Sequence, residues 1–143
     1  RGGTENVPGI VGLAKSVEIA VSEREAESKR LTSLRAYFIS ELFKIFPKMV
    51  LNGRLTERLP GNINVSIPGV GTEFLTQQLD AKGIAVSTKS TCMKDEDDSY
   101  VIRALKGEAW RAHHSLRISL GRFTTEKELC QGLEIFCRTI KMC

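Results

Sequence analysis

Aromatic residues are scarce in this sequence, at 6% of its 143 residues, and no apolar run approaches the length of a membrane span. A transmembrane helix needs about 20 mostly apolar residues in a row, and binding of single-stranded nucleic acid relies on aromatic side chains beside a basic groove. The 21 basic and 17 acidic residues are spread along the chain and leave a net charge of +4 without a basic block. We therefore expect no membrane segment and no nucleic-acid partner.

Cysteine is also scarce, with four residues at positions 92, 130, 137 and 143, and none has the Cys-x-x-Cys spacing of a zinc site. Three of the four share one C-terminal segment, so reduced thiols are a simpler interpretation than a set of disulfides. The first residues precede no apolar signal-peptide core and include no initiator methionine, which indicates a fragment or a processed chain. The sequence thus predicts a cytoplasmic protein without a metal site.

Helical periodicity dominates the first 47 residues. Apolar residues recur at helical spacing over 7–21, after Asn6 as a possible N-cap, and again over 31–45 up to Pro47. The stretch between them, 22–30, is highly charged. It is either a solvated face of one long helix or a bend between two helices.

Beyond Pro47, short strand patterns alternate with helical ones, and a hydrophobic content of 41% suffices for one core. Strands are expected at 50–51, 62–67, 84–86 and 113–120. Helices are expected at 72–82 with Thr72 as N-cap, at 99–105, and at 125–140, where Thr125 and Glu128 form a capping box and Cys137 faces inward. The elements predict an α+β fold, with a small antiparallel-rich sheet of about four strands and helices packed on it.

Cys92 lies in the stretch 83–100, which passes from an apolar segment into a polar loop with four consecutive acids. A free cysteine is more often a buried small residue, but no apolar periodicity turns Cys92 inward. The backbone of so polar a loop needs water or side-chain partners, which makes the thiol accessible. Lys89 and Lys94 favour the thiolate, the nucleophilic form, whereas the acids at 95–98 disfavour it.

Several short motifs occur here in the order in which they occur in one enzyme family. They are Arg1-Gly-Gly-Thr-Glu-Asn-Val-Pro-Gly-Ile-Val-Gly, Asn52-Gly, Asn64-Val-Ser, Gly83-Ile-Ala-Val-Ser, Ser90-Thr-Cys92, Ser99-Tyr-Val-Ile-Arg-Ala-Leu and Ser115-Leu-Arg-Ile-Ser-Leu-Gly-Arg-Phe-Thr-Thr-Glu. In these motifs, essentially the whole chain resembles the C-terminal part of a cysteine desulfurase. The resemblance is to the branch of this class V aminotransferase family that serves iron–sulfur cluster assembly.

The resemblance implies a fold and a domain context. Members of the family are dimeric pyridoxal-phosphate enzymes of fold type I, with a large cofactor domain and a small domain. The sequence is similar to the small domain: residues 1–47 correspond to linking helices that lead from the cofactor domain, and residues 48–143 to a small α/β domain that carries the cysteine loop. A homodimer is expected for the full-length protein.

Three residues match functional positions of the family. Cys92 matches the cysteine that carries a persulfide, Arg117 the arginine that binds the substrate carboxylate, and Thr4 the threonine that reaches the cofactor phosphate of the neighbouring subunit. Taken without the family, Arg117 is more often a residue in a surface salt bridge, and Thr4 is part of a flexible terminus. The family's cofactor lysine and general-base histidine have no counterpart here, so the 143 residues alone are expected to be inactive.

The resemblance implies that the full-length enzyme removes sulfur from L-cysteine as a persulfide on Cys92 and forms alanine. The sulfur would pass to an iron–sulfur scaffold or another acceptor protein. The alternative hypothesis is a stand-alone module that kept the fold and the thiol to relay sulfur or to dock a scaffold, without catalysis of its own.

Overall fold

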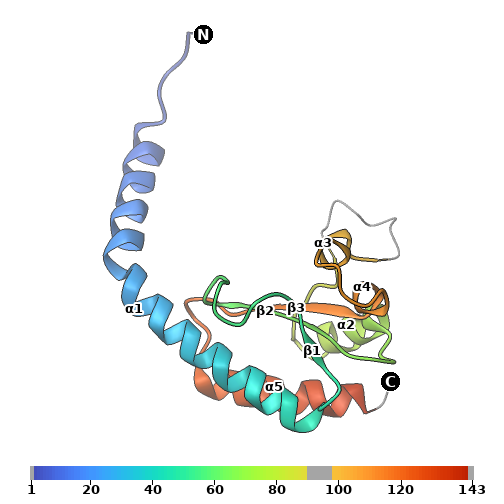
Figure 1. Cartoon of the computed structure of the whole chain (residues 1–143). Helices are drawn as coiled ribbons and strands as arrows, with labels where there is room; N and C mark the ends of the chain where they lie inside the picture. The colour runs from blue at the N-terminus through green and yellow to red at the C-terminus, as the bar shows by residue number, and fades with distance from the viewer. Residues whose placement is uncertain (1, 90–97, 142–143) are drawn as a thin grey trace.

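The computed structural model describes residues 2–89 and 98–141 and has an α+β fold (Figure 1). Its helices are α1 (Val7–Ile45), α2 (Thr72–Asp80), α3 (Tyr100–Ala104), α4 (Trp110–His113) and α5 (Glu126–Ile140), and its strands are β1 (Val50–Leu51), β2 (Asn62–Ser66) and β3 (Ser115–Ser119). The expected antiparallel sheet with helices packed on it is confirmed. The described residues form three strands rather than about four.

Helix α1 is continuous over 39 residues and begins at the expected cap, where the Asn6 side chain accepts a hydrogen bond from the Gly9 amide at 3.1 Å. At 1.5 Å per residue it is about 58 Å long. The charged stretch 22–30 is therefore a largely exposed part of one helix, which curves along its length but does not break into two (Figure 1). It contains no proline or glycine, and an ion pair between Glu27 and Arg30, at 2.8 Å, supports the helix there.

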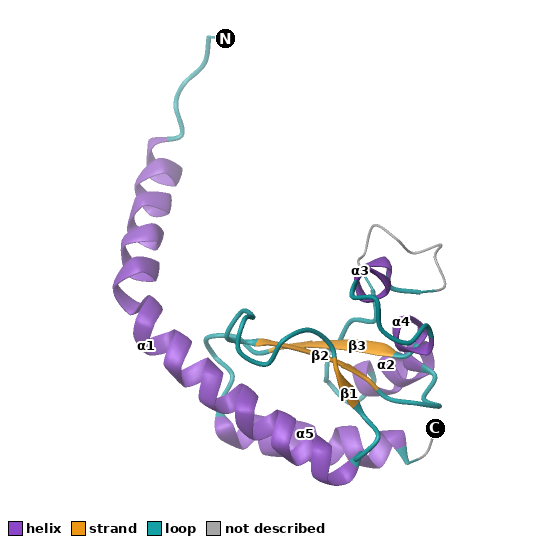
Figure 2. Ribbon diagram, viewed as in Figure 1, coloured by secondary structure: helices purple, strands orange, loops and turns teal. Residues whose placement is uncertain are grey.

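The sheet has the order β1-β2-β3, and both pairings are antiparallel. Because side chains alternate along a strand, the sheet has one apolar and one polar face. Ile63, Val65 and Leu116 are fully buried on the apolar face, which packs on α5, α2 and the C-terminal half of α1. Asn64 and Arg117 lie on the polar face, and α3 lies on that side of the sheet (Figure 2).

The strand expected at 84–86 is not formed. Ser87 alone bridges to β3, through hydrogen bonds from its amide to the Arg117 carbonyl (3.0 Å) and from the Arg117 amide to its own carbonyl (2.6 Å). Upstream of Ser87 the backbone does not pair with β3, so the segment forms no strand, although its apolar side chains contact the core. Ile84 and Val86 are half-buried against the core, which explains the strand-like pattern in the sequence.

Two other boundaries differ from expectation. Gly71, not Thr72, caps α2, because the Thr72 hydroxyl instead donates to the His113 carbonyl at 3.2 Å. The expected strand 113–120 begins only at Ser115, because Trp110–His113 forms the short helix α4. The capping box of α5 is confirmed: the Glu128 carboxylate accepts from the Thr125 amide at 2.9 Å, and the Thr125 hydroxyl accepts from the Glu128 amide at 3.2 Å.

Two arginines tie α1 to loops of the sheet. Arg30 donates to the carbonyls of Gly121, Arg122 and Thr124, and the buried Arg35 donates to those of Leu59 and Pro60 at 2.9 and 3.1 Å. Hydrogen bonds from a charged donor to several carbonyls fix the loops that lead into β2 and out of β3. Among residues 2–89 and 98–141, no helix combines the length and hydropathy needed to cross a membrane.

Candidate functional site

A polar cavity of about 230 Å³ lies between the polar face of the sheet and α3. The strands contribute amide and guanidinium side chains, and α3 contributes apolar ones. The lining residues are Asn52, Asn62, Asn64, Thr88, Lys89, Ser99, Val101, Ile102, Leu105 and Arg117. The cavity has the size and mixed chemistry suited to a small polar molecule.

Arg117 projects from the middle of β3 into this cavity, as its position on the polar strand face predicts. The backbone amide and carbonyl of Arg117 form hydrogen bonds with Ser87, on the side of β3 away from β2. Arg117 and Asn64 are therefore a non-hydrogen-bonded pair, the type in which facing side chains are closest. Within the part of the chain that the structure describes, the guanidinium makes no hydrogen bond or ion pair. An arginine fork of this kind is available to a carboxylate or a phosphate.

A partly buried hydrogen-bond network adjoins the cavity. Arg111 on α4 donates through Nε (3.0 Å) and Nη2 (2.6 Å) to Oδ1 of Asn52, a residue only 4% exposed. Asn52 Nδ2 in turn donates to Asn64 Oδ1 at 2.7 Å and to Ser66 Oγ at 2.8 Å. The Ser66 hydroxyl completes the network by donating to the Arg111 carbonyl at 2.8 Å.

Lys89 and Ser99, on either side of the segment 90–97, both line the cavity. Lys89 forms an ion pair with Glu73 at 3.2 Å, and Asp98 pairs with Arg103 at 2.7 Å. Cys92 itself lies outside the described residues. Its assignment as the persulfide cysteine stays a prediction, although the described ends of its segment are at the cavity.

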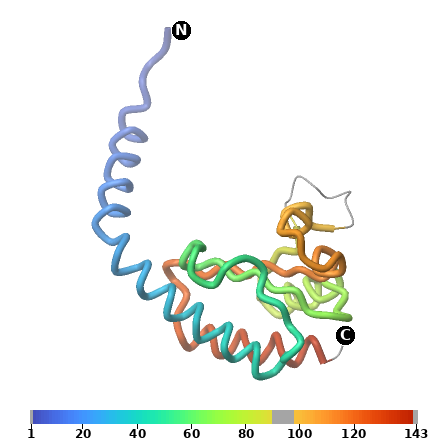
Figure 3. The backbone as a smooth tube through the Cα atoms, viewed as in Figure 1, coloured from blue at the N-terminus to red at the C-terminus, as the bar shows by residue number. Residues whose placement is uncertain are grey.

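Thr4 is not brought near Arg117. It is exposed on the extended segment before α1, at the end of the helix that lies away from the sheet (Figure 3). Its predicted partner is the cofactor of a neighbouring subunit, so separation from Arg117 within one chain is compatible with that prediction without testing it.

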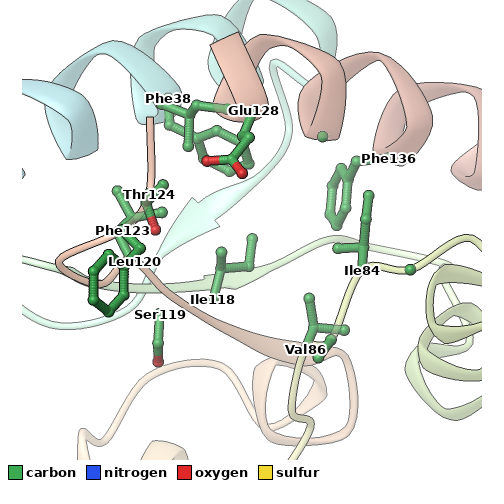
Figure 4. A pocket seen from close by; sticks show the side chains of 14 residues that line it. Phe38, Ile84, Val86, Ile118, Ser119, Leu120, Phe123, Thr124, Glu128 and Phe136 are labelled. Carbon is green, nitrogen blue, oxygen red and sulfur yellow. The ribbon is translucent and has the colours of Figure 1, made fainter. Parts of the chain in front are cut away.

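A second cavity, of about 360 Å³, lies on the apolar side of the sheet, between α5, β3 and the segment 83–86 (Figure 4). Its walls include Ile84, Phe136 and the largely exposed Phe123. Among the described residues that line it, Glu128 is the one with a charged side chain, and the capping box holds that carboxylate. Apolar walls offer few hydrogen-bond partners to a polar ligand, so the polar cavity that Arg117 lines is the candidate site.

The other described cysteines lie away from this cavity. Burial raises the pKa of the Cys137 thiol, which packs against the core as the sequence predicted. Cys130 lies 3.5 Å from the Tyr37 hydroxyl, and this hydrogen bond raises the pKa of Tyr37 to about 12. Neither thiol is placed to act at Arg117.

Comparison with known proteins agrees with the fold and shows the family. A family model described as aminotransferase class-V matches residues 1–131, so the chain belongs to the class-V aminotransferase family. It is 42% identical over 142 residues to a protein named cysteine desulfurase IscS from Dictyoglomus turgidum, covering 99% of this chain and 36% of the relative. It is 44% identical over 136 residues to a protein of the same name from Methanosarcina thermophila, covering 94% of this chain and 33% of the relative.

A solved structure titled NifS-like protein superposes with a TM-score of 0.84 at 31% sequence identity, over 100% of this chain and 36% of that one. The family and fold expected from the sequence motifs are therefore confirmed. The chain spans about a third of the length of each of these proteins.

The network beside Arg117 is not predicted by the sequence motifs. Asn52 and Asn64 occur in two of the motifs, whereas Arg111 occurs in none. The alternation of Asn62, Asn64 and Ser66 along β2 was an available signal, because it places three polar side chains on one face. The contact of Arg111 with Asn52 joins residues 59 positions apart, and no local pattern predicts it.

Proposed function

We propose that this chain is the C-terminal part of a pyridoxal-phosphate-dependent cysteine desulfurase, in which Arg117 binds the carboxylate of L-cysteine. The observation that carries the proposal is the guanidinium without an ion-pair partner in the described residues, placed in a polar cavity of about 230 Å³. Its planar fork matches a carboxylate with two parallel hydrogen bonds. The proposed substrate, L-cysteine, is inferred from the name that the relatives share, cysteine desulfurase.

Cys92 is the proposed nucleophile. Its thiolate attacks the sulfur of the bound cysteine, an S–S bond forms and the substrate C–S bond breaks. The electron pair of the broken bond remains with the substrate carbon, which takes up a proton and leaves as alanine. One thiol and one cysteine thus give one persulfide and one alanine, and no external oxidant or reductant is needed.

Thr4 is the proposed contact to the cofactor phosphate of the neighbouring subunit. It is exposed, and α1 begins three residues later without an acidic side chain in its first turn. A hydroxyl group and the positive end of a helix dipole both suit a phosphate, so the residues present fit this group. Pyridoxal phosphate, when bound, withdraws electrons from the amino acid and makes its C–S bond cleavable.

The proposal extends to the domain arrangement, partners and compartment of the full-length protein. Residues 7–26 of α1 are exposed throughout, including Val7, Val11 and Val17, which supports residues 1–47 as the link to a cofactor domain and 48–143 as the small domain. The full-length protein would be a homodimer that passes sulfur to an iron–sulfur scaffold or another acceptor protein. Because the chemistry needs a reduced thiol, we place it in the cytoplasm.

The test is Cys92→Ser in the full-length protein. Sulfide and alanine release from L-cysteine should be lost, while the absorbance of the bound cofactor stays unchanged, because Cys92 acts on sulfur and not in cofactor binding. Cys130→Ser is the matched control, since Cys130 contacts Tyr37 and not the polar cavity, and it should retain turnover. Normal turnover in Cys92→Ser would overturn the nucleophile assignment.

A further inference from the structure

We propose that Asn64 is a second hydrogen-bond donor for the substrate carboxylate beside Arg117, and that Arg111 sets the orientation of its amide through Asn52. This inference rests on the proposed carboxylate site at Arg117. It adds a binding residue and two positioning residues to that site.

The orientation of the Asn64 amide follows from the chemistry of Arg111. A guanidinium has donors and no acceptor, so the Asn52 atom that faces it, 2.6 Å from Nη2, must be the carbonyl oxygen Oδ1. Asn52 therefore turns its Nδ2 toward Asn64 and Ser66, at 2.7 and 2.8 Å. Because Nδ2 is a donor, the Asn64 atom that faces it must be the acceptor Oδ1.

This relay leaves the Asn64 Nδ2 group directed away from Asn52. Asn64 lines the polar cavity, and in residues 2–89 and 98–141 its Nδ2 donates no hydrogen bond. Two N–H donors at the edge of a cavity need acceptors when water is displaced from them. A bound carboxylate oxygen would supply one.

Asn64 and Arg117 are placed to act on the same group. They are Cα partners across β2 and β3, in the pair type whose Cβ atoms lie about 4.5–5.5 Å apart. Asn62 also lines the cavity, but it pairs with Ser119, and its amide is not oriented by the Arg111 relay. Geometry and polarity therefore select Asn64.

The first test is Asn64→Ala in the full-length protein. Asn52 keeps Ser66 as an acceptor, so the buried network survives the change. The KM for L-cysteine should rise about tenfold or more, because a hydrogen bond to a charged group is lost. The inhibition constant of cysteamine, which is cysteine without its carboxylate, should stay unchanged. Ser119→Ala, on the same face of β3, is the control and should alter neither value.

The second test is Asn52→Asp, which reverses the relay. The new carboxylate still accepts from Arg111, but the atom that replaces Nδ2 is an acceptor and needs donors from Asn64 and Ser66. The Asn64 amide would flip and present its oxygen to the cavity, and the KM for L-cysteine should again rise about tenfold or more. A merely structural role of Asn52 would leave the KM for L-cysteine unchanged, whatever the change in melting temperature.

The outcomes separate this inference from the proposed function. If Arg117→Ala raises the KM for L-cysteine while Asn64→Ala and Asn52→Asp leave it unchanged, the role of Asn64 is refuted and the site at Arg117 stands. If Arg117→Ala leaves the preference for L-cysteine over cysteamine unchanged, the carboxylate site itself is refuted, and the inference falls with it.

Discussion

Replacing Arg117 in the full-length protein tests the carboxylate site most directly. The fork can make two charge-assisted hydrogen bonds, each contributing about 1.5–3 kcal/mol, and partial solvent exposure of Arg117 in this chain reduces that sum. We expect Arg117→Ala to lose about 2–4 kcal/mol of substrate binding, a rise in KM of about 30- to 1,000-fold. Arg117→Lys keeps the charge but loses the fork, so it should cost about half as much free energy.

The assay measures KM and kcat for L-cysteine by alanine release, beside the inhibition constant of cysteamine. The expected effect is on KM for L-cysteine, with cysteamine unaffected, because only the compound with a carboxylate meets the guanidinium. Arg138→Ala serves as the control, since Arg138 is exposed on α5, which packs on the other face of the sheet. A change of less than threefold in Arg117→Ala, or an equal loss of cysteamine binding, would refute the reasoning.

The remaining predictions concern stability, measured by unfolding of the full-length protein. Leu42→Ala removes a fully buried side chain from the core and should cost about 2–5 kcal/mol, whereas Leu55→Ala, at an exposed position, should stay within about 0.5 kcal/mol. Thr125→Ala breaks the capping box and should cost about 1 kcal/mol. The hydrogen bond from the Thr125 amide lowers the pKa of Glu128 below its ordinary value of 4.5. The free energy of unfolding of the wild type should therefore exceed that of Glu128→Gln by its full amount above pH 4.5, and this difference should vanish as the pH falls through the lowered pKa. A difference that grows toward acid pH would contradict this sign.

The small sheet packs on the core with one face and lines the candidate site with the other. Period-two alternation sends Ile63 and Val65 into the core and leaves Asn62 and Asn64 on the other side of the same strand. Helices α1 and α5 cover the first face, and the short helix α3 bounds the cavity on the second. A change of register by one residue would exchange the two sets, so packing of the core also fixes which polar groups meet at Arg117.

The amino-acid sequence determined the elements whose signals are local. The cap at Asn6, the capping box of Thr125 and Glu128, and the alternation of β2 and β3 each depend on residues a few positions apart, and each is confirmed. The order of short motifs also identified the family. Local signals failed where the tertiary environment decides: the apolar segment at Ile84 has the composition of a strand but packs on the core beside the ladder.

The tertiary structure alone decided how the candidate site is assembled. Arg111, Asn52, Asn64 and Arg117 come from one short helix and from the three strands or their ends. The two amides are oriented only because the half-buried Arg111 guanidinium, which can only donate, contacts Asn52. No periodicity encodes such a relay, since it depends on contacts between residues up to 59 positions apart. The sequence thus determined which chemical groups are present, and folding determined which of them face the same cavity.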